Sequence, residues 1–323
     1  MNFIRNSVFI VKGLQEFTRN GFEKASKNFN AADLENISIN GRSYMITGSN
    51  SGIGKVVATE LAKAGGTVHL VCRNPERGEA ALNEIKEESK NNSVFLHVVD
   101  LAKPRDVYKF AHDFAEKGEG LDVLVNNAGC MVHQRNLDDL GFETNFATNT
   151  LAVHLLTETL LPLIRKSSDP RVITVSSGGM LTQKLNAVDI QSLKGSHDGT
   201  SSYAQQKRQQ VVLSELYAVR HPGVHFSTMH PGWADTPAVR DAMPSFYEKM
   251  KNKLRSPEEG ADTVIWLALS PAVRSIESGK FFLDRQPVAT HLPLSRTQES
   301  DTDRQSFIAA LDEMLQKVKQ SVA

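Results

Sequence analysis

Short apolar and β-branched runs alternate with longer segments of helical period from residue 42 onward. The short runs predict seven strands, at 43–47, 67–72, 93–99, 121–127, 171–177, 224–230 and 280–284. Between them, helical spacing predicts helices at 52–63, 75–90, 104–117, 138–164, 202–220 and 257–269. Such alternation is typical of βαβ units. We therefore predict an α/β fold built on a doubly wound, parallel, seven-stranded sheet.

The pattern is different at the two ends of the chain. We predict a single domain over residues 42–285, an N-terminal amphipathic extension over 1–41, and a C-terminal tail and helix over 286–323. The tail ends in a helical pattern that gathers five apolar residues on one face: Phe307, Leu311, Met314, Leu315 and Val318. The spacing of apolar residues in the N-terminal extension also places four of them on one helix face: Phe3, Ile10, Leu14 and Phe17.

The composition excludes several classes of protein. Lys and Arg number 37, as do Asp and Glu, so no overall charge would draw the chain to nucleic acid. No apolar run approaches the length of a membrane span. With only Cys72 and Cys130, we expect no disulfide framework and a reducing, cytoplasmic compartment. The scattered His, Asp and Cys residues show no metal-ligand spacing, so we predict no metal site.

A turn that contains three glycines connects the first predicted strand to the first predicted helix. It reads Thr47-Gly48-Ser49-Asn50-Ser51-Gly52-Ile53-Gly54. Glycines let the backbone approach a pyrophosphate, and the free N–H groups and dipole of the following helix bind its charge. The sequence therefore predicts a Rossmann-type dinucleotide site, although its glycine spacing differs from the common G-x-G-x-x-G pattern.

Tyr203 and Lys207 form a second candidate motif. Residues four apart lie on one face of a helix, and a cation beside a phenol lowers the phenol pKa, which yields an acid-base group usable near neutral pH. The pair Tyr247 and Lys251 has the same spacing. Because no predicted strand lies just before that second pair, we interpret it as a solvated helix face.

Together these motifs give a resemblance to a known family. Asn126-Asn127-Ala128-Gly129 follows the fourth strand, Val175-Ser176-Ser177 ends the fifth, and Pro231-Gly232 follows the sixth. With the glycine turn and the Tyr203–Lys207 pair, they stand in the order found in short-chain dehydrogenases/reductases. Over about residues 42–285 the chain resembles that family, which implies a nicotinamide-dependent oxidoreductase that interconverts alcohols and carbonyls.

The resemblance also implies roles for four residues. Tyr203 would be the general acid and base, and Lys207 would hold the nicotinamide ribose and lower the Tyr203 pKa. Ser177 would bind the substrate oxygen, and Asn149 would hold a proton-relay water. We choose Ser177 over Ser176 because neighbouring strand residues face opposite sides and because the family uses the second serine. The 26 positions between Ser177 and Tyr203 leave room for a loop that compact family members lack.

The expected cofactor is NADP(H), with NAD(H) as the alternative. Arg73 follows the second strand, with no acid before Glu76, and an arginine there accommodates a 2′-phosphate. By resemblance, the cofactor would contact Thr47, Gly48, Ser49, Asn50, Gly52, Ile53, Gly54, Arg73, Asp100, Asn127, Ala128, Gly129, Tyr203, Lys207, Pro231, Gly232 and Thr236.

Two questions about partners stay open in the sequence. The expected partner is a small alcohol or carbonyl compound, and the apolar residues after Pro231 favour a lipophilic one: Trp233, Met243, Phe246, Tyr247 and Met250. The alternative function is a catalytically silent nucleotide-binding scaffold. The basic amphipathic helix within residues 1–30 fits either peripheral binding to an intracellular membrane or packing against the protein itself or a second subunit.

Overall fold

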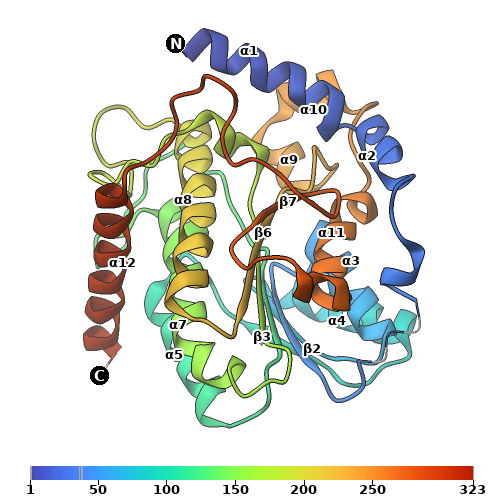
Figure 1. Ribbon diagram of the computed structural model, residues 1–323. Coiled ribbons are helices and arrows are strands. Elements are labelled where there is room, and N and C mark those ends of the chain that lie inside the picture. The colour runs from blue at the N-terminus through green and yellow to red at the C-terminus, as the bar shows by residue number, and fades with distance from the viewer. Residues whose placement is uncertain (1, 36, 38, 323) are drawn as a thin grey trace.

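An eight-stranded sheet with the order β3-β2-β1-β4-β5-β6-β7-β8 runs through the computed structural model, which describes residues 2–35, 37 and 39–322 (Figure 1). The first seven strands are parallel, and the chain crosses the sheet between β3 and β4. This confirms the predicted doubly wound fold. The strands are β1 Ser43–Thr47, β2 Thr67–Cys72, β3 Val94–Val98, β4 Val123–Asn126, β5 Arg171–Val175, β6 His225–Met229, β7 Phe281–Leu283 and β8 Gln286–Pro287.

The eighth strand corrects the predicted count of seven. β8 pairs antiparallel with β7 across a turn at Asp284 and Arg285, whose φ angles are 51° and 60°. Two successive positive φ angles are typical of the type I′ turn, which suits the twist of a hairpin. The sequence did not indicate this turn because neither residue is glycine or asparagine. Pro287 is tolerated in a strand because β8 lies at the edge of the sheet.

Helices cover both faces of the sheet and bury a core on each. One face carries α3 Gly52–Lys63, α4 Pro75–Ser89 and α11 Pro257–Leu269. The other carries α5 Pro104–Glu116, α7 Ala152–Ile164 and α8 Gly199–Arg220. The C-terminal helix α12, Asp301–Val322, packs on this second layer (Figure 1). Four of its five predicted face residues are buried there and Met314 is partly buried.

The helix predicted over 138–164 begins only at Thr144. Before it, the Asp138 carboxylate accepts hydrogen bonds from the N–H groups of Leu140 and Phe142, which closes a turn instead of a helix. Glu143 then accepts from Phe146 N at 2.8 Å and caps the helix. The helix runs as α6 Thr144–Phe146, a π-helical turn η3 Ala147–Leu151, and α7.

The N-terminal extension forms α1 Asn2–Lys12, a π-helical turn η1 Gly13–Phe17, and α2 Arg19–Ser26. The predicted single apolar face is wrong beyond Lys12. Ile10 is 52% and Leu14 is 44% exposed, whereas Phe17 is 1% exposed and packs against the protein. A π-helical turn advances fewer degrees per residue than an α-helix, so it rotates Phe17 away from the other two. The side chain of Phe3 lies outside the described part of the structure.

Arg255 holds the extension to the rest of the protein. Its guanidinium donates to the carbonyl oxygens of Glu16, at 2.6 Å, and Thr18, at 3.3 Å. The same group forms two hydrogen bonds with Asp284 at the β7–β8 turn. Beside it, the Phe17 ring meets His230 edge-on, with centroids 4.3 Å apart.

Among the described residues, no helix is long and apolar enough to cross a membrane.

Candidate active site

A cleft of about 330 Å³ lies at the carboxyl ends of the central strands. Its walls come from the β1–α3 turn, the ends of β4 and β5, the first turns of α8, and the segment after β6. This is where open α/β sheets bind ligands. Fourteen of the predicted site residues line it: Gly48, Asn50, Gly52, Ile53, Gly54, Asn127, Ala128, Gly129, Ser177, Tyr203, Lys207, Pro231, Gly232 and Thr236.

The glycine turn has the geometry of a cradle for a phosphate group. Gly48 and Gly52 have φ angles of 67° and 53°, which few other residues adopt. A Cβ at Gly54 would lie 2.4 Å from Asn127 Nδ2, so only glycine fits. Within the described residues, Ser51 gives α3 no side-chain cap. The N–H groups at the start of α3 are therefore available to an anion in the cleft, which fits a dinucleotide pyrophosphate.

Thr47 and Ser49 lie behind this turn, not in the cleft wall. The Thr47 hydroxyl accepts from the N–H groups of Asn127 and Ala128, each at 3.0 Å. Ser49 is fully buried and its hydroxyl donates to the carbonyl of Ile46 at 3.1 Å. These two predicted cofactor residues therefore support the shape of the turn, and their contact with a ligand would be through the main chain.

Arg73 and Asp100 lie outside the cleft wall, at the ends of the neighbouring strands β2 and β3. Arg73 is exposed directly after β2. Asp100 is partly buried and its carboxylate accepts from Ala102 N at 3.1 Å. Because β2 pairs with β1 and β3 pairs with β2, both residues lie on the side of β1 opposite to β4 and β5, away from Tyr203.

Tyr203, Lys207 and Ser177 meet at the opposite side of the cleft. The Ser177 side chain lies close enough to the Tyr203 phenol to act on its pKa, and Lys207 Nζ lies 5.3 Å from the centroid of the Tyr203 ring. The neighbouring Ser176 is buried and donates to the main-chain oxygen of Lys207 at 2.9 Å. The structure thus brings Ser177, and not Ser176, to the phenol.

Burial shifts the acid-base properties of this pair. It raises the pKa of Tyr203 to about 12, although the Ser177 side chain acts in the opposite direction. It lowers the pKa of Lys207 to about 7. The sequence predicted a lowered pKa for Tyr203, and the structure shows the reverse because desolvation penalises the phenolate. The phenol is therefore protonated at neutral pH.

Asn149 lies on η3, one layer behind the cleft wall, and is fully buried. Its side chain accepts from Cys130 N at 2.9 Å and donates to Cys130 O at 2.8 Å. It also donates to Gln206 Oε1 at 2.7 Å, and its main-chain oxygen accepts from Gln210 Nε2 at 2.6 Å. Asn149 therefore fixes the segment after β4 against α8.

Gln206 and Gln210 were not among the residues predicted for the site. Counted from Tyr203, they stand three and seven positions further along α8, and Lys207 stands at position four. These intervals place all four on one helix face. The helical spacing indicates this shared face, whereas the partners of the two glutamines are known only from the structure.

The remaining end of the cleft is apolar. It is formed by Trp233 and by the short helices α9 Pro237–Ala242 and α10 Pro244–Met250, with Met243 and Phe246 in the wall. Trp233 meets Phe246 edge-on with ring centroids 5.3 Å apart. Behind it, Trp233 N donates to Phe17 O at 2.7 Å, so the N-terminal extension supports this wall.

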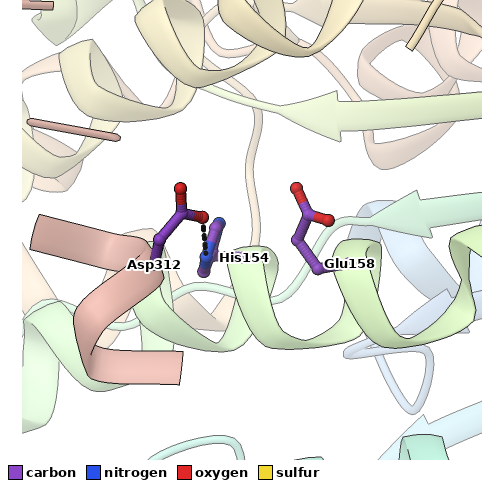
Figure 2. Close-up of side chains that lie close together, drawn as sticks. All are labelled: His154, Glu158 and Asp312. Atoms are coloured by element: carbon purple, nitrogen blue, oxygen red, sulfur yellow. Dashed lines mark ion pairs between the residues drawn. The ribbon is translucent and has the colours of Figure 1, made fainter. Parts of the chain in front are cut away.

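A second polar cluster joins α12 to α7, and none of its residues lines the cleft. Figure 2 shows Asp312 facing His154, with Glu158 one turn further along α7. These side chains are of metal-ligating types and their ligand atoms lie within 4.8 Å of one another. However, Arg220 donates to both carboxylate oxygens of Asp312, at 3.1 and 2.7 Å, and lies 3.5 Å from Glu158. The arginine thus supplies the positive charge, and the cluster is an ion-pair network that holds α12.

Comparison with known proteins agrees with this geometry. The family described as short chain dehydrogenase matches residues 42–244. Dehydrogenase/reductase SDR family member 12 of Bos taurus is 54% identical over 319 residues, 99% of this chain and 100% of that protein. Retinol dehydrogenase 12 of Homo sapiens is 33% identical over 253 residues, 77% of this chain and 79% of that protein.

A solved structure shows the same fold. It is a putative short chain dehydrogenase from Escherichia coli CFT073 complexed with NADPH, with a TM-score of 0.62 and 23% identity. The match covers 80% of this chain and 100% of that one. The similarity therefore covers most of the chain and shows the same fold.

Proposed function

The chain belongs to the short-chain dehydrogenase family and is an oxidoreductase, and on that premise we propose that it moves hydride between NADP(H) and a lipophilic carbonyl or alcohol, with Tyr203 as general acid and base. One observation carries the proposal. The Tyr203 phenol, its Ser177 partner and Lys207 face the same cleft as the glycine turn and the uncapped start of α3. A dinucleotide whose pyrophosphate binds at the glycine turn would therefore have its nicotinamide end near Tyr203.

Different residues of the cleft would bind the pyrophosphate and the nicotinamide end of the cofactor. The main chain at Gly52 to Gly54 would hold the pyrophosphate, and Asn127 to Gly129 and Lys207 would hold the nicotinamide end. The nicotinamide, when bound, supplies or takes up the hydride. The chain's own residues supply orientation, exclusion of water and the proton.

The proton step follows from the pKa of Tyr203. In reduction, the substrate oxygen accepts hydrogen bonds from the Ser177 and Tyr203 hydroxyls, and Tyr203 gives it a proton as negative charge develops there. The charge on Lys207 stabilises the phenolate that remains. In oxidation, the phenolate takes the alcohol proton. The raised pKa of Tyr203 keeps the phenol protonated at neutral pH, so the proton that reduction needs is present.

Arg73 supports a preference for NADP(H). Its exposed guanidinium follows β2, beside the strand that leads into the glycine turn. A cation there pairs with a 2′-phosphate, whereas the acid of an NAD-selective site would repel it. The E. coli protein of the same fold was solved with NADPH, which is consistent with this choice.

The apolar wall supports a lipophilic substrate. Trp233, Met243 and Phe246 enclose the end of the cleft nearest α9 and α10, and a bulky apolar group would displace water from them. The relatives include proteins named retinol dehydrogenases, and retinol is an apolar alcohol. We extend that substrate class, and not the particular compound, to this chain.

The N-terminal helix supports binding at a membrane surface on the cytoplasmic side. Ile10, Val11 and Leu14 are 52%, 54% and 44% exposed and form a continuous patch across α1 and η1. The extension also carries exposed cations at Arg19, Lys24 and Lys27. An apolar patch flanked by cations fits an anionic bilayer surface. Packing of the patch against a second copy of the chain is the alternative.

A substrate panel tests the enzymatic function directly. Aldehydes, ketones, retinoids and steroids are incubated with the full chain and NADPH or NADH, and nicotinamide absorbance is followed. We expect NADPH-dependent reduction of at least one lipophilic carbonyl compound. Tight NADPH binding without turnover of any member would instead support the catalytically silent scaffold.

A further inference from the structure

The side chain of Gln210 bridges Lys207 and Asn149. Its Oε1 accepts from Lys207 Nζ at 3.1 Å, and its Nε2 donates to the main-chain oxygen of Asn149 at 2.6 Å. Gln210 is 1% exposed, so solvent does not compete for either bond. Lys207 Nζ also donates to Val175 O at 2.8 Å. The amide therefore occupies the space between the lysine and the Asn149 carbonyl.

We propose that Gln210 is a positioning residue of the reaction, which holds the Lys207 ammonium group beneath Tyr203 and closes the path from Lys207 to the Asn149 carbonyl. This inference rests on the proposed function of the Tyr203–Lys207 pair. In this arrangement the Gln210 side chain takes the place of the relay water that the family resemblance implies at Asn149. A glutamine can fill that place because its amide carries one acceptor and donors on a single planar group.

The chemistry of the amide has a consequence for the proton. A water molecule between a lysine and a carbonyl can accept a proton and pass another on. An amide is neither an acid nor a base in the accessible pH range, so it orients Lys207 without conducting protons. The proton that Tyr203 gives to substrate is then replaced from the cleft, whose wall includes Tyr203.

The hydrogen bond to Gln210 also affects the pKa of Lys207. Burial lowers the pKa of Lys207 to about 7, and the carbonyl dipoles of Gln210 and Val175 face its ammonium group. A carboxylate in place of the amide would favour the charged lysine, and an apolar group would disfavour it. Substitutions at residue 210 should therefore move the Lys207 pKa in opposite directions.

Two near-isosteric variants test this on the full chain. Gln210→Glu retains an acceptor for Lys207, and Gln210→Met removes both hydrogen bonds at similar volume. Gln209→Met is the matched control, because Gln209 is equally buried on α8 but bonds to Thr150 and Ile190. Thermal unfolding of each variant shows whether the fold is retained.

The first readout is the pKa of Lys207 in the cofactor-free protein. It is measured by ¹³C NMR of lysine labelled at Cε, with the Lys207 signal assigned by its loss in Lys207→Met. We expect Gln210→Glu to raise this pKa by about one unit or more and Gln210→Met to lower it. Gln209→Met should leave it unchanged. Equal values in wild type and Gln210→Glu, or a shift in Gln209→Met as large as in Gln210→Glu, would overturn the proposal.

The second readout is the pH dependence of kcat for NADPH-dependent reduction of the aldehyde that the panel shows to be turned over fastest. The pH at which kcat falls as pH rises should be higher in Gln210→Glu and lower in Gln210→Met, because the pKa of Lys207 shifts in the same direction. If Tyr203→Phe removes turnover while both Gln210 variants keep the wild-type profile, only this inference fails. If Tyr203→Phe keeps turnover, the proposed function itself fails.

Discussion

Arg255 donates two hydrogen bonds to the carboxylate of Asp284, at 2.6 and 2.9 Å, and both side chains are buried. The same guanidinium binds the main chain of the N-terminal extension at Glu16 and Thr18. One arginine therefore joins three segments that are distant in sequence. It also lies against Gly232, where a Cβ would come within 2.2 Å of Arg255 Nε.

Removing this arginine should destabilise the protein strongly. In Arg255→Met, the Asp284 carboxylate is left buried without its partner, which costs about 3–5 kcal/mol. The free energy of unfolding in urea measures the loss. Arg274→Met is the control, because its guanidinium is exposed and its buried partner Asp169 keeps two hydrogen bonds from Arg171. Loss of this one exposed arginine should cost at most about 1 kcal/mol, and equal losses in the two variants would contradict the role given to Arg255.

Arg73→Ala should weaken use of NADPH and leave use of NADH almost unchanged. The reason is that a cation–phosphate hydrogen bond is made with the 2′-phosphate alone. Loss of one such bond contributes about 1.5–3 kcal/mol, so kcat/KM for NADPH should fall about tenfold or more. Steady-state kinetics with each cofactor measure the ratio. An equal fall with both cofactors, or a wild-type preference for NADH, would exclude the role assigned to Arg73.

The ion-pair network at α12 should make stability depend on pH. The His154 ring, whose Nε2 lies 3.4 Å from Oδ1, and the two hydrogen bonds from Arg220 hold the pKa of the Asp312 carboxyl well below its usual range. A carboxyl with a lowered folded-state pKa stabilises the fold above its unfolded-state pKa, and this stabilisation is lost as pH falls. Asp312→Asn should therefore cost about 1 kcal/mol at neutral pH and progressively less in acid.

Urea unfolding from pH 7 down to pH 3 measures this dependence. The control is Glu313→Gln, which changes the exposed neighbour of Asp312 on the same helix. It should leave the difference between neutral and acid stability as it is in wild type. A constant penalty for Asp312→Asn across the whole pH range would show that the carboxylate charge does not hold α12.

Binding to anionic membranes should depend on the exposed patch of α1 and η1. The full chain is tested with Ile10, Val11 and Leu14 changed together to Ser, because the buried contacts of Phe17 make a truncated chain a poor comparison. Co-sedimentation with phosphatidylcholine–phosphatidylserine vesicles should be lost in the triple variant. Val219→Ser is the control, since Val219 is 83% exposed on α8.

Two outcomes would contradict the membrane proposal. Equal sedimentation of the wild type and the triple variant would show that the patch does not bind lipid. Loss of a dimer in the triple variant, measured by analytical ultracentrifugation without vesicles, would assign the patch to a second copy of the chain.

The parallel strands and the glycine turn could be predicted because their signals are local. Each strand is a short apolar run, and Gly48, Gly52 and Gly54 stand between a strand and a helix. The Tyr203–Lys207 spacing is local as well. The eighth strand has no such local signal, since Asp284-Arg285 lacks the glycine or asparagine that usually marks this turn, and the two residues are held by Arg255 and Asp262, which are distant in sequence.

The remaining differences depend on tertiary surroundings. Phe17 was assigned to the face of Ile10 and Leu14, and the π-helical turn that separates them leaves no mark in the hydrophobic pattern. Likewise, the direction of the Tyr203 pKa depends on how far burial outweighs the neighbouring lysine, which spacing does not reveal. Gln210 was overlooked for a different reason, because glutamine is ordinary in a helix until its partners are known.

We propose that the Tyr203 hydroxyl gives and takes the proton at the reacting oxygen. Tyr203→Phe tests this role, with kcat measured with NADPH and the Kd of NADPH measured by fluorescence. The hydroxyl acts on the substrate, whereas the glycine turn and α3 bind the pyrophosphate. We therefore predict that kcat falls by about 10²-fold or more while the Kd of NADPH stays near the wild-type value. A variant that keeps more than about a tenth of the wild-type kcat would contradict the claim.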